Sequence, residues 1–308
     1  MSKLKVLELF AGIGACSKAL TNLGIEHEIV DAVEIDKYAV QSFNAVHGTN
    51  FAPQDITKWD KDIECDLIMH GSPCQDFSVA GKGAGGDKDS GTRSSLMYET
   101  LRIVEKLKPK YVIWENVKNL LSKKHRHNFD AYLDAMYDLG YENNYKILNA
   151  KDYGIPQNRE RVFTVSIRKD IYNGYFFPAP VPLEKRLKDM LEDEVDEKYY
   201  LSDAMLEYVL CPGTKTYHRT PTLDNDVART INATVAKMHR AGIDNYISSA
   251  KCQQVGTLNI KGQDCIKRVY SDNGLSPTLT NMQGGNRQPK IVAKKENRGA
   301  VSKDKKQH

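Results

Sequence analysis

The first group in this sequence that could do chemistry is a cysteine in a loop. Residues 71–78 read GSPCQDFS and follow an apolar run at 66–70 that predicts a buried strand. Cys74 therefore stands after the strand, whereas a structural cysteine more often lies within the apolar run. A helix N-terminus or a basic group nearby would raise the fraction of thiolate, which is the nucleophilic form. Cys74 is therefore a candidate nucleophile.

A glycine turn and two acidic residues form a second group. In the segment ELFAGIGA, Gly12 and Gly14 would let the backbone approach a ligand closely. The dinucleotide pattern G-x-G-x-x-G would need a third glycine where Ser17 stands, so a dehydrogenase fits poorly and an ordinary structural turn stays open. Glu34, at the end of the next predicted strand, could accept both ribose hydroxyls of a nucleoside cofactor. Asp55 could accept from an adenine amino group, although either acid could instead be a cap or a surface charge.

Further polar groups follow later strands. The segment WENV places Glu115 and Asn116 at the end of a predicted strand, and QNRER places Arg159 and Arg161 just before another. An arginine pair could clamp a carbonyl or a phosphate, although solvated arginines are the commoner case. The glycine-rich stretch 79–95 could act as a lid over a substrate or be a plain surface loop.

Short apolar runs alternate with amphipathic stretches through the first half of the chain. Strands are predicted at 5–10, 28–34, 66–70, 111–115, 145–148 and 162–167, and helices at 15–23, 37–46, 97–107 and 129–139. This alternation predicts an α/β fold with a parallel, doubly wound sheet covered on both faces. Ligands of such sheets bind beyond the carboxyl ends of the strands.

The pattern changes after the proline-rich segment PAPVP at 178–182, a plausible linker. Residues 1–180 are expected to form the catalytic and cofactor-binding domain, and 181–292 a smaller, mostly β domain with long loops. Residues 293–308 are basic and almost free of apolar side chains, which indicates a charged tail.

Composition limits the other possibilities. The six cysteines are scattered without a CxxC pair, so neither a metal site nor a disulfide framework is expected. No apolar run approaches the roughly 20 residues that span a membrane, and no secretory signal is expected. A cytoplasmic protein, prokaryotic or phage-encoded, is predicted, with the nucleus as the eukaryotic alternative. The net charge of +4 is compatible with nucleic acid but also with many plain enzymes.

Four motifs together resemble the DNA cytosine-5 methyltransferase family. FAGIG, GSPCQ, ENV and QNRER occur in the family's order and spacing over roughly residues 4–170, with a looser match at 267–291. Any one motif is weak evidence, and four in order are strong. The resemblance implies a Rossmann-like, S-adenosylmethionine-dependent methyltransferase domain followed by a target-recognition domain that binds double-stranded DNA.

The resemblance also implies roles for individual residues. The residues expected to hold S-adenosyl-L-methionine, which leaves as S-adenosyl-L-homocysteine, are Phe10, Gly12, Gly14, Glu34, Asp55 and Pro73. Cys74 would be the nucleophile, Glu115 would hold the N3/N4 edge of a flipped cytosine and Arg159 its O2, with Arg161 supporting the site. Further contacts with the substrate are expected from Gln75, Ser78, Asn116 and Gln157.

The sequence departs from the family pattern in one respect. Members normally continue into a segment like RxLTxxE and then a YKQxGNSV-like strand, neither of which is found here. A second polypeptide could supply this closing segment, or the chain could self-associate, and a non-catalytic or half-enzyme DNA-binding subunit stays open. An RNA cytosine methyltransferase is a weaker alternative, because the Cys-Phe-Thr signature of those relatives is missing. The bases recognised stay open too; basic residues that could contact DNA are Arg219, Arg229, Lys237, Arg240 and Arg287.

Overall fold

The computed structural model describes most of the first two-thirds of the chain. The described residues are 3–73, 96–192, 195, 200–202, 205, 209, 222–231 and 244–248, with the backbone alone at 254–257, 268–270 and 290–291. The chain divides into two compact units, Met1–Lys185 and Arg186–His308. The domain boundaries expected at 180/181 and 292/293 stay predictions.

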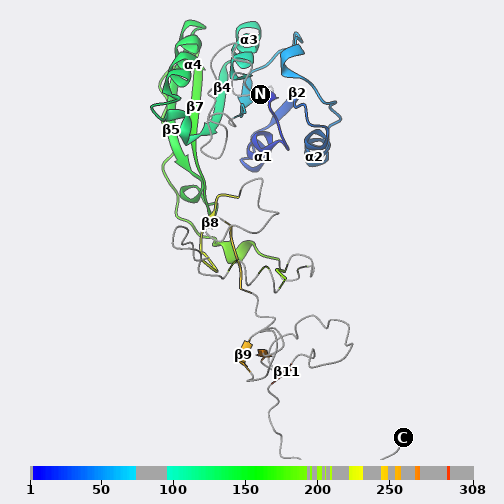
Figure 1. Cartoon of the computed structure of the whole chain (residues 1–308). Coiled ribbons are helices and arrows are strands. Elements are labelled where there is room, and N and C mark those ends of the chain that lie inside the picture. The colour runs from blue at the N-terminus through cyan, green and yellow to red at the C-terminus, as the bar shows by residue number, and fades with distance from the viewer. Residues whose placement is uncertain are drawn as a thin grey trace, which may run out of the picture. The chain divides into compact units, whose positions relative to one another are not determined.

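A six-stranded sheet forms the centre of the first unit (Figure 1). Its strands, in spatial order, are β2 (His27–Val33), β1 (Leu4–Leu9), β3 (Leu67–His70), β4 (Tyr111–Val117), β7 (Glu160–Arg168) and β5 (Tyr141–Asn149). Neighbouring strands from β2 to β4 pair in parallel, while β7 runs antiparallel to both β4 and β5. The α/β fold class is confirmed, but the prediction of a wholly parallel sheet is wrong for β7. The physical reason is the short link at 150–159, which suits a return to the adjacent antiparallel position and has no room for a crossover helix.

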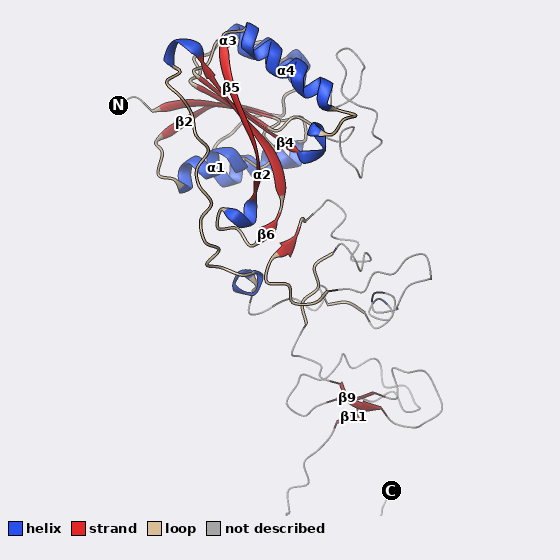
Figure 2. Ribbon diagram, turned by 90° about the vertical axis from the view of Figure 1, so that its left-hand side faces the viewer, coloured by secondary structure: helices blue, strands red, loops and turns tan. Residues whose placement is uncertain are grey.

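Helices cover both faces of this sheet. Figure 2 shows α3 and α4 on one face and α1 and α2 on the other, as a doubly wound fold requires. The helices are α1 (Ala15–Asn22), α2 (Lys37–His47), α3 (Met97–Leu107) and α4 (Arg126–Asp138). Short 3-10 helices follow several strands: η1 (Ile56–Lys58), η3 (Lys118–Leu121), η4 (Ala150–Asp152) and η5 (Lys169–Ile171). No helix within the described ranges is long and apolar enough to cross a membrane.

The larger core lies under α3 and α4. Trp114 of β4 is buried there, with its ring centroid 4.3 Å from that of Tyr132 and 5.8 Å from that of Phe129, both on α4. A smaller cluster on the opposite face joins Leu20 of α1 to Met69 of β3. Burying a large apolar side chain contributes about 1.5–3 kcal/mol, so these contacts dominate the stability of the first unit.

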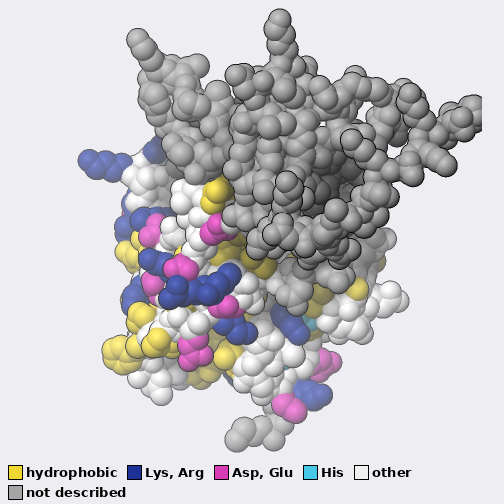
Figure 3. Space-filling model, turned by 90° about the horizontal axis from the view of Figure 1, so that it is seen from below, with side chains coloured by type: hydrophobic (Ala, Val, Ile, Leu, Met, Phe, Trp, Pro, Cys, Tyr) yellow, Lys and Arg dark blue, Asp and Glu magenta, His cyan; other side chains and the backbone are white. Residues whose placement is uncertain are grey.

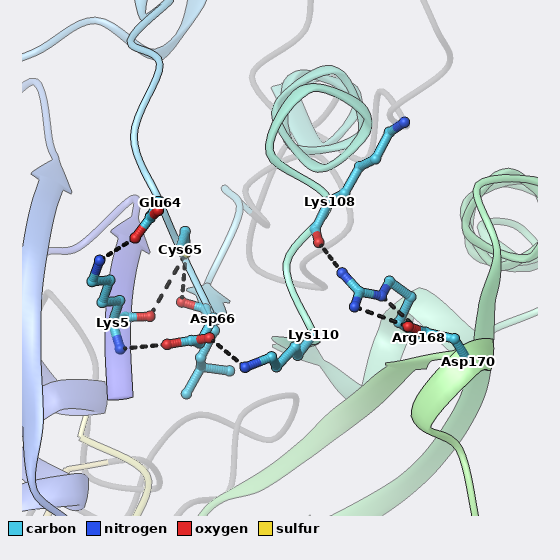
Figure 4. A network of polar contacts seen from close by, with 9 residues as sticks. Lys5, Glu64, Cys65, Asp66, Lys108, Lys110, Arg168 and Asp170 are labelled. Carbon is cyan, nitrogen blue, oxygen red and sulfur yellow. Dashed lines mark hydrogen bonds and ion pairs between the residues drawn. The ribbon is translucent and has the colours of Figure 1, made fainter. Parts of the chain in front are cut away.

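Ion pairs and hydrogen bonds join the strands at the amino edge of the sheet (Figure 4). Lys5 N donates to Asp66 Oδ2 at 3.0 Å, and Lys110 Nζ lies 2.9 Å from Asp66 Oδ1. Arg168 Nη1 donates to Lys108 O at 2.7 Å, which ties the end of β7 to the start of β4. The charges at this edge are paired with one another, and the carboxyl edge carries the residues of the candidate site.

The second unit is described in pieces. Its elements are η6 (Leu187–Met190) and the strands β8 (Ala228–Arg229), β9 (Gln254–Thr257), β10 (Arg268–Tyr270) and β11 (Lys290–Ile291). β10 pairs antiparallel with β9 and parallel with β11. Asp224 accepts hydrogen bonds from the backbone and the hydroxyl of Ser248, which joins two segments distant in the sequence.

A substitution in the first turn tests how tightly α1 packs on α2. Gly14 has φ +83°, and a Cβ there would overlap His47 Nε2 and lie 2.8 Å from Phe43 Cε2. We expect Gly14→Ala to lower the free energy of unfolding by about 2–4 kcal/mol, from both backbone strain and overlap. Gly24→Ala is the matched control, because Gly24 has φ +68° with open space around the Cβ position. Urea denaturation that shows equal losses for the two variants would contradict the packing argument.

Candidate cofactor and active site

The turn between β1 and α1 bends through left-handed backbone. Phe10, Gly12 and Gly14 have φ of +54°, +55° and +83°. Ala11 N donates to Val33 O at 3.1 Å, so the turn is attached to the end of β2. A Cβ added at Gly12 would meet nothing within 4 Å, which leaves space beside this backbone for a ligand.

Glu34 lies directly beside this turn. Its Oε2 accepts from Gly12 N at 3.0 Å and its Oε1 accepts from Asp36 N at 2.9 Å. These two bonds fix the orientation of the carboxylate at the end of β2. Each carboxylate oxygen can accept more than one hydrogen bond, so both retain capacity for ribose hydroxyls.

Asp55 caps the short helix η1. Its Oδ1 accepts from Thr57 N at 3.0 Å and from Thr57 Oγ1 at 2.8 Å, and these bonds hold the pKa of Asp55 below its ordinary value. Its Oδ2 lies 3.9 Å from Lys58 Nζ and is the less engaged oxygen. Gln54 N donates to Glu34 O at 2.7 Å, so the backbone places the two predicted cofactor acids on adjoining segments.

Two exposed isoleucines adjoin Gly12 and Glu34 in the sequence, and they were not among the predicted site residues. Ile13, inside the glycine turn, is 59% exposed, and Ile35, directly after Glu34, is 70% exposed. Apolar side chains at a strand end can cover the faces of a planar base. The signal in the sequence was an isoleucine next to a strand-terminal acid, outside the apolar periodicity of the strand. Glu34, Asp55, the open space at Gly12 and these side chains together fit the adenosine half of a nucleoside cofactor.

The loop after β3 is attached to β4. Trp114 Nε1 donates to Ser72 Oγ at 3.0 Å, and Asn116 Nδ2 lies 3.3 Å from both Ser72 O and Ser72 Oγ. Asn116 Oδ1 accepts from Val117 N at 2.8 Å, so the described contacts of this amide are within the protein. The structure gives Asn116 a part in holding the loop, and its role as a substrate contact stays a prediction. Pro73 is half-buried at the end of this described segment.

Other predicted site residues lie outside the described residues. They are Cys74, Gln75 and Ser78, and the predicted lid at 79–95 falls in the same stretch. Cys74 is covalently next to Pro73, so the loop attached to β4 leads directly to it. Its role as the nucleophile stays a prediction.

Glu115 and Arg161 form an ion pair across β4 and β7. Arg161 Nε lies 2.8 Å from Glu115 Oε1, with about a third of the glutamate side chain exposed. Glu115 Oε2 lies 3.5 Å from the position that a Cβ would take at Gly71. The structure therefore brings Glu115 and Arg161 together beside the loop that leads to Cys74. Arg159 N donates to Asn149 Oδ1 at 3.0 Å, which holds its backbone before β7.

Gln157 lies in β6 (Gln157–Asn158), where its backbone N donates to Ile155 O at 2.6 Å. Its side chain is half-buried. Its contact with substrate stays a prediction.

The described cysteines are unsuited to nucleophilic catalysis. Burial raises the pKa of the Cys16 thiol to about 12, with Glu8 and Glu115 adding to the effect. Burial also raises the pKa of Cys65 to about 12. Both thiols therefore stay protonated near neutral pH and are poor nucleophiles.

Buried polar groups support the ends of β1 and β3. Glu8 is almost fully buried and its Oε1 accepts from Ser17 N at 2.7 Å; burial raises the pKa of this carboxyl. His70 Nε2 lies 3.0 Å from Tyr132 Oη, and its ring stacks on Trp114 at an interplanar angle of 4°. Burial lowers the pKa of His70 to about 3, so the ring is neutral near pH 7.

Of the basic residues that could contact DNA, the structure describes one, Arg229 in the second unit. Arg229 Nη2 donates to Thr222 Oγ1 at 2.8 Å and Nη1 donates to Asp244 O at 3.5 Å, so this guanidinium holds neighbouring segments together. The other predicted contacts, Arg219, Lys237, Arg240 and Arg287, lie outside the described residues. On the coloured part of the surface in Figure 3, basic side chains stand next to acidic ones.

The sheet, covered by helices on both faces, is that of a Rossmann-like S-adenosylmethionine-dependent methyltransferase. The model of the C-5 cytosine-specific DNA methylase family matches residues 4–307. The chain therefore belongs to this family, and the predicted resemblance is confirmed. As a member, the protein is a DNA cytosine-5 methyltransferase that uses S-adenosyl-L-methionine.

Individual relatives agree with this assignment. The orphan methyltransferase M.Rho11sI of Bacillus phage rho11s is 33% identical over 355 residues, covering 95% of this chain and 70% of that protein. The type II methyltransferase M2.ScrFI of Lactococcus lactis subsp. cremoris is 34% identical over 270 residues, covering 68% of this chain and 75% of that protein. A solved structure of a Spodoptera frugiperda DNMT2 mutant has a TM-score of 0.65 at 20% identity, covering 80% of this chain and 76% of that one. This last likeness shows the fold alone.

The buried histidine predicts a pH dependence of stability. The folded state holds the pKa of His70 at about 3, while the unfolded chain has an ordinary value near 6.5. The unfolded chain therefore binds a proton that the folded protein excludes, and stability falls as pH drops below about 6.5. We expect a loss of about 2 kcal/mol from this group between pH 7 and pH 5. Denaturant titrations should show a weaker pH dependence for His70→Gln than for the wild type; equal slopes would refute the neutral buried ring.

Proposed function

We propose that the protein transfers a methyl group to C5 of cytosine in a specific double-stranded DNA sequence, through a covalent adduct between Cys74 and a flipped base. The observation that carries this proposal is the placement of Glu115. Its carboxylate is held by Arg161 at 2.8 Å and lies beside the Gly71 backbone of the loop that leads to Cys74. A nucleophile and an acidic group that act on the same base must both reach it, and Cys74 follows Gly71 by three positions in the sequence.

The proposed chemistry starts from the weak nucleophilicity of C5 within an aromatic ring. Addition of the Cys74 thiolate to C6 forms an S–C bond and places electron density on C5. When bound, S-adenosylmethionine supplies the methyl group. A base then removes the C5 proton, the S–C bond breaks and the thiolate is restored. A stacked base offers no room for attack on C6, so the cytosine must leave the helix.

In this proposal the two oxygens of the Glu115 carboxylate have different roles. Arg161 Nε occupies Oε1, and Arg161 Nη1 donates to Glu160 O at 2.8 Å, so the guanidinium is fixed to β7. Oε2 faces the loop at Gly71 and is the oxygen that we assign to the N3/N4 edge of the base. A proton held between Glu115 and N3 would offset the negative charge that develops in the ring. Arg159 is assigned to the O2 atom of the base.

The cofactor assignment follows from the turn after β1. We assign the ribose hydroxyls to Glu34 and the adenine amino group to Asp55, with Phe10, Gly12 and Gly14 shaping the turn and Pro73 bordering it. Two observations support this assignment. Both Glu34 carboxylate oxygens can accept further hydrogen bonds, and Oδ2 is the less engaged oxygen of Asp55. We place the activity in the bacterial cytoplasm, because the relatives come from bacteria and their phages.

Removal of the proposed nucleophile is the direct test. We expect Cys74→Ala to lower methyl transfer to duplex DNA by at least about a thousandfold, because the covalent step is lost. Cofactor affinity measured by calorimetry should stay within about threefold, since the thiol acts on the base. Cys65→Ala, at the opposite edge of the sheet, should retain activity. Turnover of Cys74→Ala within tenfold of the wild type would mean that another group is the nucleophile.

We also propose a second partner besides DNA. The closing segment expected from the family pattern is not found in the printed sequence, and we propose that another polypeptide that carries it binds this chain, or that two copies of the chain associate. Light scattering should detect self-association, or a polypeptide carrying the YKQxGNSV-like segment should raise both melting temperature and methyl transfer. A monodisperse, fully active monomer with a high melting temperature would defeat this proposal.

A further inference from the structure

A buried carboxylate in β2 takes no part in the chemistry described above. Asp31 is 2% exposed, within a strand whose last residues are otherwise apolar. An ionised group in such a place is destabilising unless it is fully paired. Its partners therefore show what this carboxylate does.

Four donors converge on Asp31. Its Oδ1 accepts from Ala32 N at 3.0 Å and Gln54 Nε2 at 2.8 Å. Its Oδ2 accepts from Trp59 Nε1 and Lys61 Nζ, each at 2.8 Å. Three of these donors come from one segment, 54–61, which carries Asp55. The carboxylate thus binds this segment to the strand that ends in Glu34.

A second attachment holds the same segment from α3. Arg102 Nη1 donates to Trp59 O and Nη2 donates to Ile56 O, both at 2.9 Å. Glu99 orients the guanidinium through a 2.9 Å bond to Arg102 Nε. The two carbonyls lie at either end of the turn that Asp55 caps, so the fork of the guanidinium fixes that turn as a unit.

The backbone completes the arrangement. Gln54 N donates to Glu34 O at 2.7 Å, and Gln54 Nε2 also donates to Ala32 O at 2.9 Å. Asp55 thus lies between a residue bonded to β2 and a turn held from α3. Its position relative to Glu34 is determined by these contacts.

We propose that Asp31 and Arg102 are positioning residues for the cofactor: together they hold Asp55 at the place, relative to Glu34, where its carboxylate recognises the adenine amino group. This rests on the proposed assignment of Glu34 to the ribose and of Asp55 to the adenine. Loss of either positioning residue lets Asp55 move while Glu34 keeps its own bonds to Gly12 and Asp36. The defect therefore falls on recognition of the adenine ring rather than on the ribose or the DNA.

The experiment compares two ligands that differ at the purine 6-position. S-adenosylhomocysteine carries an amino group there, which donates to a carboxylate, and S-inosylhomocysteine carries a carbonyl oxygen, which repels one. Calorimetry should show that wild-type protein prefers the adenosyl ligand. Asp31→Asn keeps the shape of the side chain but turns one acceptor into a donor that faces other donors. We expect Asp31→Asn and Arg102→Met each to weaken the adenosyl ligand about tenfold and the inosyl ligand less than about twofold.

The control is Lys61→Met, which removes the half-exposed partner of the same carboxylate and should change both affinities less than about twofold. KM for DNA should stay unchanged in all three variants. Equal weakening of the two ligands, or unchanged preference in both Asp31→Asn and Arg102→Met, refutes the proposal and leaves a structural role. If Asp31→Asn fails to fold, Arg102→Met alone decides between these outcomes.

Asp55→Ala separates this proposal from the assignment on which it rests. Loss of adenine preference in Asp55→Ala together with normal preference in Asp31→Asn and Arg102→Met refutes the positioning role alone. Full preference in Asp55→Ala refutes the assignment of Asp55, and the positioning role with it.

Discussion

Parallel hydrogen bonding between β1, β2, β3 and β4 brings the carboxyl ends of these strands to one edge of the sheet. In this register Leu9 pairs with Val33 and His70, and His70 pairs with Trp114. The residues after these positions therefore lie in a row, although they are far apart in the sequence. The glycine turn, the Glu34 carboxylate, the loop at Gly71 and the Glu115 carboxylate all take their places from this pairing. A shift of one strand by one residue would send these side chains to the opposite face.

Much of this arrangement could be predicted from periodicity and strand-end composition. Alternating apolar runs located the main strands and helices, because burial imposes a period on each type of element. The glycine turn after β1 and the place of Glu34 after β2 could be predicted, because glycines and an acidic residue stand directly after apolar runs that read as strands. The reversal of β7 was missed, since an apolar strand looks the same in either direction. That reversal places Arg161 beside Glu115, so the central ion pair of the proposed site could not be seen in advance.

Other contacts could not be predicted for a different reason. Asn116 follows Glu115 in a polar motif, and the sequence does not show that it is buried and bonded to Ser72; its contact with substrate stays a prediction. Asp31 gave no signal, because a single acid in a strand is most often assumed to face water. The role of Asp31 depends on hydrogen-bond donors 23 to 30 residues away in the sequence, which only the fold brings together. Buried polar groups need partners, so their function lies in contacts that no local pattern contains.

The backbone of Phe10 has a further consequence. An aromatic residue at φ +54° is strained, and such conformations store on the order of 1–3 kcal/mol. The ring packs against the main core, so these contacts offset the backbone strain. The sharp turn after β1 and the intrinsic backbone preference of this residue thus oppose each other. Selection for thermal stability alone would favour glycine or asparagine at this position, because these residues adopt left-handed backbone with less strain. Such a residue would lose the packing of the aromatic ring, so the first turn of the fold carries a trade-off between backbone strain and core packing.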